Sequence, residues 1–113
     1  MDKLTDFFKM LSDETRLRIL VLLYHKKLCV CQLCGIMEET QPKISKHLAK
    51  LRDTGFVKVQ RKEQFIYYFL SFDNKMYDDV LKNIIDNVQS FETLKNDVEK
   101  IYTAEKFLNI CDC

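Results

Sequence analysis

The chain has 113 residues, 47% of them hydrophobic and 31% charged, a composition typical of one globular domain with its own core. It contains only two glycines and one proline, so loops should be few and short and helices are favoured. The longest aliphatic run, residues 19–23, is far too short to cross a membrane, and no targeting signal is recognisable, so we expect a cytoplasmic protein. Cytoplasmic thiols stay reduced and the five cysteines are an odd number, so a disulfide framework is disfavoured.

The first part of the chain repeats apolar residues at helical spacing. This pattern predicts short helices over residues 4–11, 14–24 and 30–37. Ser12 and Asp13 are suited to cap the second helix, because a short polar side chain can accept a hydrogen bond from an exposed backbone N–H. Cys29 stands at or just before the start of the third helix, and residues 38–40 are expected to form a turn.

A fourth helix is predicted to begin at Thr40 or Gln41. Pro42 falls in its first turn, where the missing N–H costs little, and Gly55 falls just past its end, where a left-handed cap is expected. The buried stripe of this helix has spacings of four and three and consists of Ile44, Leu48 and Leu51. The positions that face outward are Lys43, Ser45, Lys46, Ala49 and Lys50.

Two runs of β-branched and aromatic residues, 56–60 and 65–70, follow the fourth helix and predict a β-hairpin. The charged residues 61–64 between them are expected to form its tip. The predicted fold is therefore mainly α with a small β-hairpin, a winged helix-turn-helix, in one domain over residues 1–113.

From residue 75 to about residue 107 the chain has no Gly or Pro and repeats apolar residues at spacings of four and three. This pattern indicates a long amphipathic helix, with a break near Ser90 as one option. The apolar stripe is wide for so small a domain, so we expect residues 75–108 to pack against a second copy of the chain. Residues 109–113 are expected to be a flexible tail.

Three cysteines lie within six residues, at Cys29, Cys31 and Cys34. Thiolates are soft ligands that select thiophilic ions, and three of them suit a three-coordinate centre such as As(III) or Sb(III) better than a four-coordinate zinc. Buried apolar packing is the alternative for cysteines of this kind. On a regular helix Cys31 and Cys34 are neighbours, whereas Cys29 points away, so binding by all three requires a non-helical or unwound first turn.

Residues 41–62 carry seven basic residues against the single acid Asp53, although the whole chain has a net charge of only +1. Such a local basic block is typical of a phosphate-binding face. A helix-turn-helix inserts its second helix into the major groove of DNA, which assigns four residues to the groove: Gln41, Lys43, Ser45 and Lys46. The residues expected to contact phosphates are Lys50, Arg61 and Lys62. No cofactor is expected to be needed for DNA binding.

Three segments together resemble the arsenite-responsive branch of the ArsR/SmtB family over roughly residues 4–75. They are Leu-Ser-Asp-Glu-Thr-Arg-Leu-Arg-Ile-Leu at 11–20, Leu-Cys-Val-Cys-Gln-Leu-Cys at 28–34, and Gln-Pro-Lys-Ile-Ser-Lys-His-Leu-Ala-Lys-Leu-Arg at 41–52. The resemblance implies a homodimeric repressor that leaves double-stranded operator DNA when As(III) or Sb(III) binds its cysteines. It also implies dimer contacts from the first and last helices.

Other readings of the cysteines stay open. Cys111 and Cys113 could add ligands to the same site, form a second soft-ion site, or belong to an inert tail, which is the reading favoured. The same DNA-binding fold could instead respond to thiol oxidation or to Cd(II) or Pb(II). A thiol-disulfide enzyme is the weakest reading, because no thioredoxin-like βαβ pattern surrounds the C-x-x-C spacing of Cys31 and Cys34, and we expect no enzyme activity.

Overall fold

The computed structural model describes residues 2–108 and has the predicted fold class, mainly helical with one two-stranded antiparallel hairpin. Its elements, in chain order, are α1 (Asp2–Leu11), α2 (Glu14–His25), α3 (Val30–Met37), α4 (Gln41–Asp53), β1 (Val57–Lys62), β2 (Phe65–Leu70), α5 (Lys75–Asp86), the 3-10 helix η1 (Val88–Ser90), α6 (Glu92–Glu99) and the 3-10 helix η2 (Ile101–Phe107).

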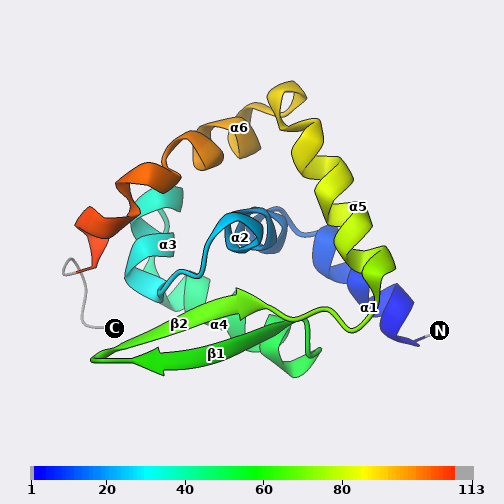
Figure 1. Ribbon diagram of the computed structural model, residues 1–113, viewed down its shortest axis with the longest axis horizontal. Coiled ribbons are helices and arrows are strands. Elements are labelled where there is room, and N and C mark those ends of the chain that lie inside the picture. The colour runs from blue at the N-terminus through cyan, green and yellow to red at the C-terminus, as the bar shows by residue number, and fades with distance from the viewer. Residues whose placement is uncertain (1, 109–113) are drawn as a thin grey trace.

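Helix α2 is the centre of the molecule. Figure 1 shows it end-on, with the hairpin on one side and the C-terminal helices arching over the other. Its residues Ile19, Leu20, Val21 and Leu22 are consecutive and all fully buried, so this helix is apolar on every side in its middle. A helix that is hydrophobic all round is stable only when other elements cover it completely. The surrounding helices therefore fold around α2 as their common core.

The helix-turn-helix agrees closely with the sequence prediction. Asp13 caps α2 by accepting a hydrogen bond from the backbone N–H of Arg16 at 3.0 Å. Glu38 ends α3 with a φ of 55°, and the sharp turn that follows leads into α4. Gly55, past the end of α4, has a φ of 86°, a backbone conformation that glycine adopts without strain. The predicted stripe of α4 is fully buried: Ile44, Leu48 and Leu51.

The tip of the hairpin is shorter than the sequence suggested. Arg61 and Lys62, predicted to lie in the tip, continue β1, and Lys62 pairs directly with Phe65. Only Glu63 and Gln64 remain in the turn, and Glu63 has a φ of 58°, the left-handed conformation that tight hairpins require. The strand pairing therefore extends to Lys62, further than the charge pattern indicated. The backbone of a charged residue forms the hydrogen bonds of a strand as well as the backbone of any other residue.

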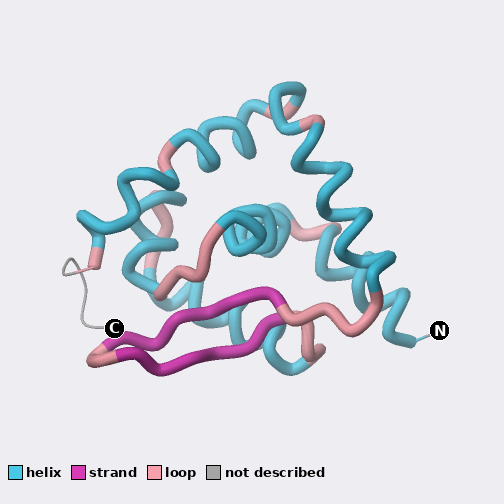
Figure 2. The backbone as a smooth tube through the Cα atoms, in the orientation of Figure 1, coloured by secondary structure: helices cyan, strands magenta, loops and turns pink. Residues whose placement is uncertain are grey.

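The C-terminal region is not one long helix. Figure 2 shows its helical path interrupted on both sides of η1, between α5 and α6, and again before η2. Helix α5 packs on α1, with the rings of Tyr77 and Phe7 4.5 Å apart. The chain then turns back, so that α6 contacts α2 and η2 lies on α3. We call residues 91–107 the C-terminal strap.

This folding back covers part of the apolar stripe that the sequence assigned to a second subunit. Tyr77, Leu81 and Val88 are already buried inside the single chain. Among the described residues, the large apolar side chains that remain exposed are Phe8 (51%), Ile66 (39%), Met76 (40%), Phe91 (51%) and Tyr102 (86%). Phe8 is exposed because the buried face of α1 is filled by Phe7 and Met10. The surface left for a partner is thus smaller than the helical pattern alone indicated.

A long apolar helix that could cross a bilayer is not found between residues 2 and 108.

Candidate thiol site and nucleic-acid interface

Cys29 occupies the N-cap of α3 in an extended conformation, with φ −92° and ψ 173°. Its backbone N–H donates to the side-chain Oε1 of Gln32 at 3.0 Å, and the Nε2 of the same Gln32 donates to the carbonyl of Ala104 in η2 at 3.2 Å. Cys29 and Gln32 are 0% and 1% exposed. One buried amide thus joins the start of the cysteine helix to the C-terminal strap, a contact that could not be predicted from sequence.

Cys34 is half-buried and lies near Cys29. Burial raises the pKa of the Cys34 thiol, and the neighbouring Cys29 and Glu39 raise that pKa further. Cys31, on the first turn of α3, is 1% exposed. Within the described range 2–108, no three His, Cys, Asp or Glu side chains are grouped closely enough to hold a metal ion.

The residue before the cluster is attached to the hairpin. The N–H of Leu28 donates to the carbonyl of Tyr68 at 3.2 Å, and the N–H of Tyr68 donates to the carbonyl of Leu28 at 2.8 Å, which forms an isolated antiparallel bridge. Burial raises the pKa of Tyr67, and the nearby Cys29 thiol contributes to that increase. The start of α3 and the strand β2 are therefore in direct contact.

The outward side of α4 carries the predicted DNA-contacting residues. Gln41, Lys46 and Lys50 are exposed, and Ser45 is half-buried. Lys43 is exposed as well, but its Nζ forms an ion pair with the Glu39 carboxylate at 2.8 Å, so in the free protein its charge is already matched. All five residues lie on one helix, as the sequence predicted, and none of them is buried in the core.

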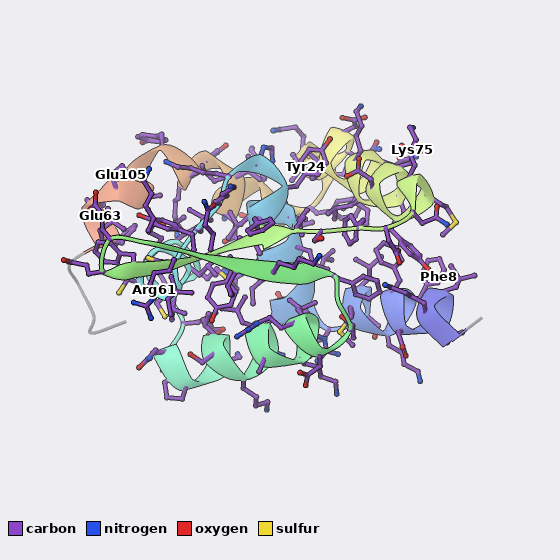
Figure 3. The ribbon with its side chains drawn as sticks, turned by 60° about the horizontal axis from the view of Figure 1, so that its bottom comes forward. Phe8, Tyr24, Arg61, Glu63, Lys75 and Glu105 are labelled. Carbon is purple, nitrogen blue, oxygen red and sulfur yellow. The ribbon has the colours of Figure 1, made fainter. Side chains whose placement is uncertain are left out.

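The basic residues of the hairpin lie apart from the core. Arg61 and Lys62 are exposed on β1, next to the turn. Figure 3 shows Arg61 and Glu63 at the same end of the hairpin, with α4 running along the lower edge of the molecule. The helix and the hairpin end thus offer two basic regions.

His47 lies on the inner side of α4 and is 7% exposed. Its Nδ1 is 3.5 Å from a guanidinium nitrogen of Arg16 and 4.0 Å from a carboxylate oxygen of Asp13. Burial lowers the pKa of His47, and the Asp13 carboxylate opposes this effect. The histidine therefore packs α4 against the start of α2. The remaining candidates, Cys111 and Cys113, lie outside the described residues.

The comparisons with known proteins agree with this arrangement. The model of the arsR family of bacterial regulatory proteins matches residues 13–59, from the cap of α2 into β1. The arsenic resistance transcriptional regulator ArsR1 of Pseudomonas putida is 42% identical over 86 residues, which cover 74% of this chain and 67% of ArsR1. The chain belongs to the ArsR family. It is accordingly a transcriptional regulator with a winged helix-turn-helix, the fold class that its sequence predicted.

Two further relatives bear on the comparison. The arsenical resistance operon repressor of Escherichia coli is 48% identical over 65 residues, 57% of this chain and 56% of that repressor. The chain thus spans between about half and two thirds of the length of these ArsR-family relatives. Among solved structures, the regulator HlyU of Vibrio vulnificus superposes with a TM-score of 0.68 at 30% identity, over 75% of this chain and 86% of HlyU.

Proposed function

We propose that this ArsR-family chain is a homodimeric repressor that leaves its operator when As(III) or Sb(III) binds Cys29, Cys31 and Cys34. The observation that carries the proposal is the position of Cys31 and Cys34 on α3, with Cys29 at its N-cap, because α3 is the helix immediately before α4. The relatives named as arsenic resistance regulators support the identity of the inducer.

DNA is contacted by α4 and the hairpin in this proposal. The N-terminal residues of α4, Gln41, Lys43, Ser45 and Lys46, enter the major groove, while Lys50, Arg61 and Lys62 contact phosphates. Lys43 must exchange its ion pair with Glu39 for a contact with DNA. Ion pairs at the surface contribute little because water and salt screen them, so the exchange costs little.

Arsenite enters as the neutral hydroxide, and each thiol replaces one hydroxyl group: As(OH)₃ and three thiols give As(SR)₃ and three waters. The protein contributes the three sulfurs and must bring them together. Because Cys29 caps the helix while Cys31 and Cys34 lie on it, the first turn of α3 has to rearrange. This rearrangement must break the hydrogen bond between the N–H of Cys29 and the side chain of Gln32.

Two contacts can transmit the rearrangement to the DNA-binding surface. Helix α3 packs directly on α4. Leu28, next to Cys29, is bridged to Tyr68 of the hairpin. A ligand that binds the rearranged state more tightly shifts the protein away from its DNA-competent state, and a coupling of about 3 kcal/mol changes operator affinity roughly 150-fold.

The dimer uses the apolar side chains that the single chain leaves exposed, among them Phe8 of α1 and Met76 of α5. Light scattering of the reduced protein at micromolar concentration should give about twice the chain mass of 13.5 kDa. A mass equal to that of one chain would contradict this part of the proposal.

The inducer is tested by titrating a preformed operator complex of the reduced protein with As(III), Sb(III), Cd(II), Pb(II) and Zn(II) in separate experiments. We expect release by As(III) and Sb(III) at the lowest concentrations, because three thiolates complete their coordination. Release by Cd(II) or Pb(II) alone would show that the site serves divalent ions. Release only after oxidation would show that the thiols themselves are the sensor.

A further inference from the structure

His47 lies where α1, α2 and α4 meet. Its Nδ1 is 3.5 Å from one terminal nitrogen of Arg16, and the other terminal nitrogen of Arg16 donates to the carbonyl of Lys9 in α1 at 3.3 Å. The Nε of Arg16 is buried and has no hydrogen-bond partner among the described residues. The guanidinium therefore connects the end of α1 with the middle of α4 through its two terminal nitrogens.

The contact between Arg16 and His47 requires one protonation state of the ring. A guanidinium carries only donors, so the Nδ1 that faces it must accept, and the proton of the neutral ring must be on Nε2. A protonated imidazole has an N–H at both nitrogens and would direct a donor at a donor. Its Nδ1–H would have to turn toward the Asp13 carboxylate, 4.0 Å away, which already accepts the N–H of Arg16 as the cap of α2. Protonation thus replaces the contact with Arg16 by a different one.

The surroundings of His47 favour the neutral ring. The charged groups that act on it are three cations and two carboxylates: Arg16, Lys43, Lys46, Asp13 and Glu39. Burial is the main cause that lowers the pKa of His47, the Asp13 carboxylate opposes it, and the three cations lower the pKa further. The stability that the neutral ring provides is therefore complete above the ordinary histidine pKa of about 6.5 and is lost as the pH falls through the lowered pKa.

The orientation of α4 depends on this contact. The buried stripe of α4 packs on the core through apolar contacts, which have no preferred direction. A hydrogen bond has a preferred distance and angle, so the contact of His47 with Arg16 adds a fixed direction to this packing. His47 directly follows Lys46, one of the residues assigned to the DNA groove. A shift of His47 therefore moves the side chains that contact DNA.

We propose that His47 is a positioning residue for DNA binding: its neutral ring orients α4 for the operator, and protonation of the ring weakens operator binding. The proposal rests on the assignment of DNA reading to α4 and adds control by protons, which the proposed release by arsenite does not include. It involves none of the cysteines. The protein in slightly acidic solution should bind its operator less tightly than at neutral pH, already in the absence of any inducer.

His47→Gln separates the protonation of the ring from its packing. The amide oxygen of glutamine can accept from Arg16 as the neutral Nδ1 does, but glutamine does not titrate. Operator affinity of the reduced proteins is measured at pH values from about 8 to about 5, at an ionic strength of about 0.15 M that screens distant charges. At the upper end His47→Gln should bind within about twofold of the wild type, and between the two ends the wild type should lose at least about fivefold more affinity than the variant.

His25→Gln is the matched control. Burial also lowers the pKa of His25, but this residue ends α2 and takes part in none of the contacts of His47 described above. The variant should keep the pH dependence of the wild type, and it leaves His47 as the one histidine of the chain. Its ring titration, followed by NMR, should give a pKa below about 6.5, and operator affinity should begin to fall at the pKa measured in the free protein.

Equal pH dependence of the wild type and His47→Gln would overturn the proposal, as would a wild-type affinity that rises relative to the variant on acidification. A His47 pKa at or above about 6.5, or an affinity that falls at a different pH, would overturn it even if His47→Gln did not fold. Unchanged operator affinity in Lys46→Ala would instead contradict the assignment of α4 to DNA, so the two failures are distinguishable.

Discussion

Arg18 of α2 and Asp97 of α6 form a two-bonded ion pair between residues far apart in the sequence. The guanidinium donates through Nε to Oδ2 at 2.7 Å and through a terminal nitrogen to Oδ1 at 2.9 Å. Asp97 is 2% exposed. The hydrogen bond to Asp97 is the main cause that raises the pKa of Arg18. This pair holds the strap on the central helix and so determines where η2 meets the cysteine helix.

Asp97→Asn should lower the free energy of unfolding by about 2–4 kcal/mol, because it leaves the Arg18 charge in a mostly buried position with a neutral partner. Urea unfolding would measure the change as a lower midpoint. The control is Asp79→Asn, which breaks the exposed Lys75–Asp79 pair at 2.9 Å and should cost less than about 0.5 kcal/mol. Equal effects of the two variants would show that the strap does not depend on the buried pair.

Gln32→Leu should lower the free energy of unfolding by about 1–3 kcal/mol while keeping a similar side-chain volume. The variant leaves the buried N–H of Cys29 and the carbonyl of Ala104 without their hydrogen-bond partner. A buried polar group without a partner lowers the free energy of unfolding by about this amount. Thermal or urea unfolding would measure it. Gln89→Leu, at an exposed position of η1, is the control and should leave stability nearly unchanged. Stability equal to that of the wild type in Gln32→Leu would mean that the amide does not join helix and strap.

Lys46→Ala should weaken operator binding without altering stability, because Lys46 is exposed and points away from the buried stripe of α4. If Lys46 contacts a phosphate, the slope of log affinity against log salt should fall by about one. Lys82→Ala on α5 is the control, since Lys82 lies outside the basic segment and pairs with Asp86 at 3.1 Å. Affinity equal to the wild type at two salt concentrations would remove Lys46 from the DNA-binding face.

Much of this arrangement is local in sequence and could be predicted from it. Pro42, the buried stripe of α4 and Gly55 fix the DNA-reading helix within fifteen residues. The sequence also placed Cys29 at or just before the start of α3, where it is the N-cap. These features need no knowledge of how distant segments meet.

The strap could not be predicted in the same way. In the sequence, Asp97 is one polar residue of an amphipathic pattern. Only the folded chain shows that it forms an ion pair with Arg18, 79 positions earlier. The role of Gln32 could not be predicted from the sequence either, because it depends on a hydrogen bond to the carbonyl of Ala104. The exposed position of Phe8 likewise follows from Phe7 having filled the space near Tyr77.

The pH dependence of binding should distinguish arsenite from cadmium. Burial raises the pKa of the Cys34 thiol, so this group is protonated at neutral pH. Cd(II) must displace the thiol protons, and its affinity should fall about tenfold per pH unit for each proton released as the pH decreases from about 8 to about 6. Arsenous acid binds with release of water and no net proton, so its affinity should change little. Calorimetry in buffers of different ionisation enthalpy would count the protons, and equal proton release by both ions would contradict this account.

The central claim is that the three clustered cysteines couple arsenite binding to release of DNA. Its most direct measurement is the arsenite concentration that releases half of a preformed operator complex, under reducing conditions, for Cys29→Ser, Cys31→Ser and Cys34→Ser. Serine has a similar shape but is a poor ligand for a soft ion, so each variant should bind the operator like the wild type and resist release. Cys29→Ser should also keep measurable arsenite affinity, since Cys31 and Cys34 can share an ion on an intact helix. Release of all three variants at the wild-type concentration, together with loss of the response in Cys111→Ser/Cys113→Ser, would contradict the account.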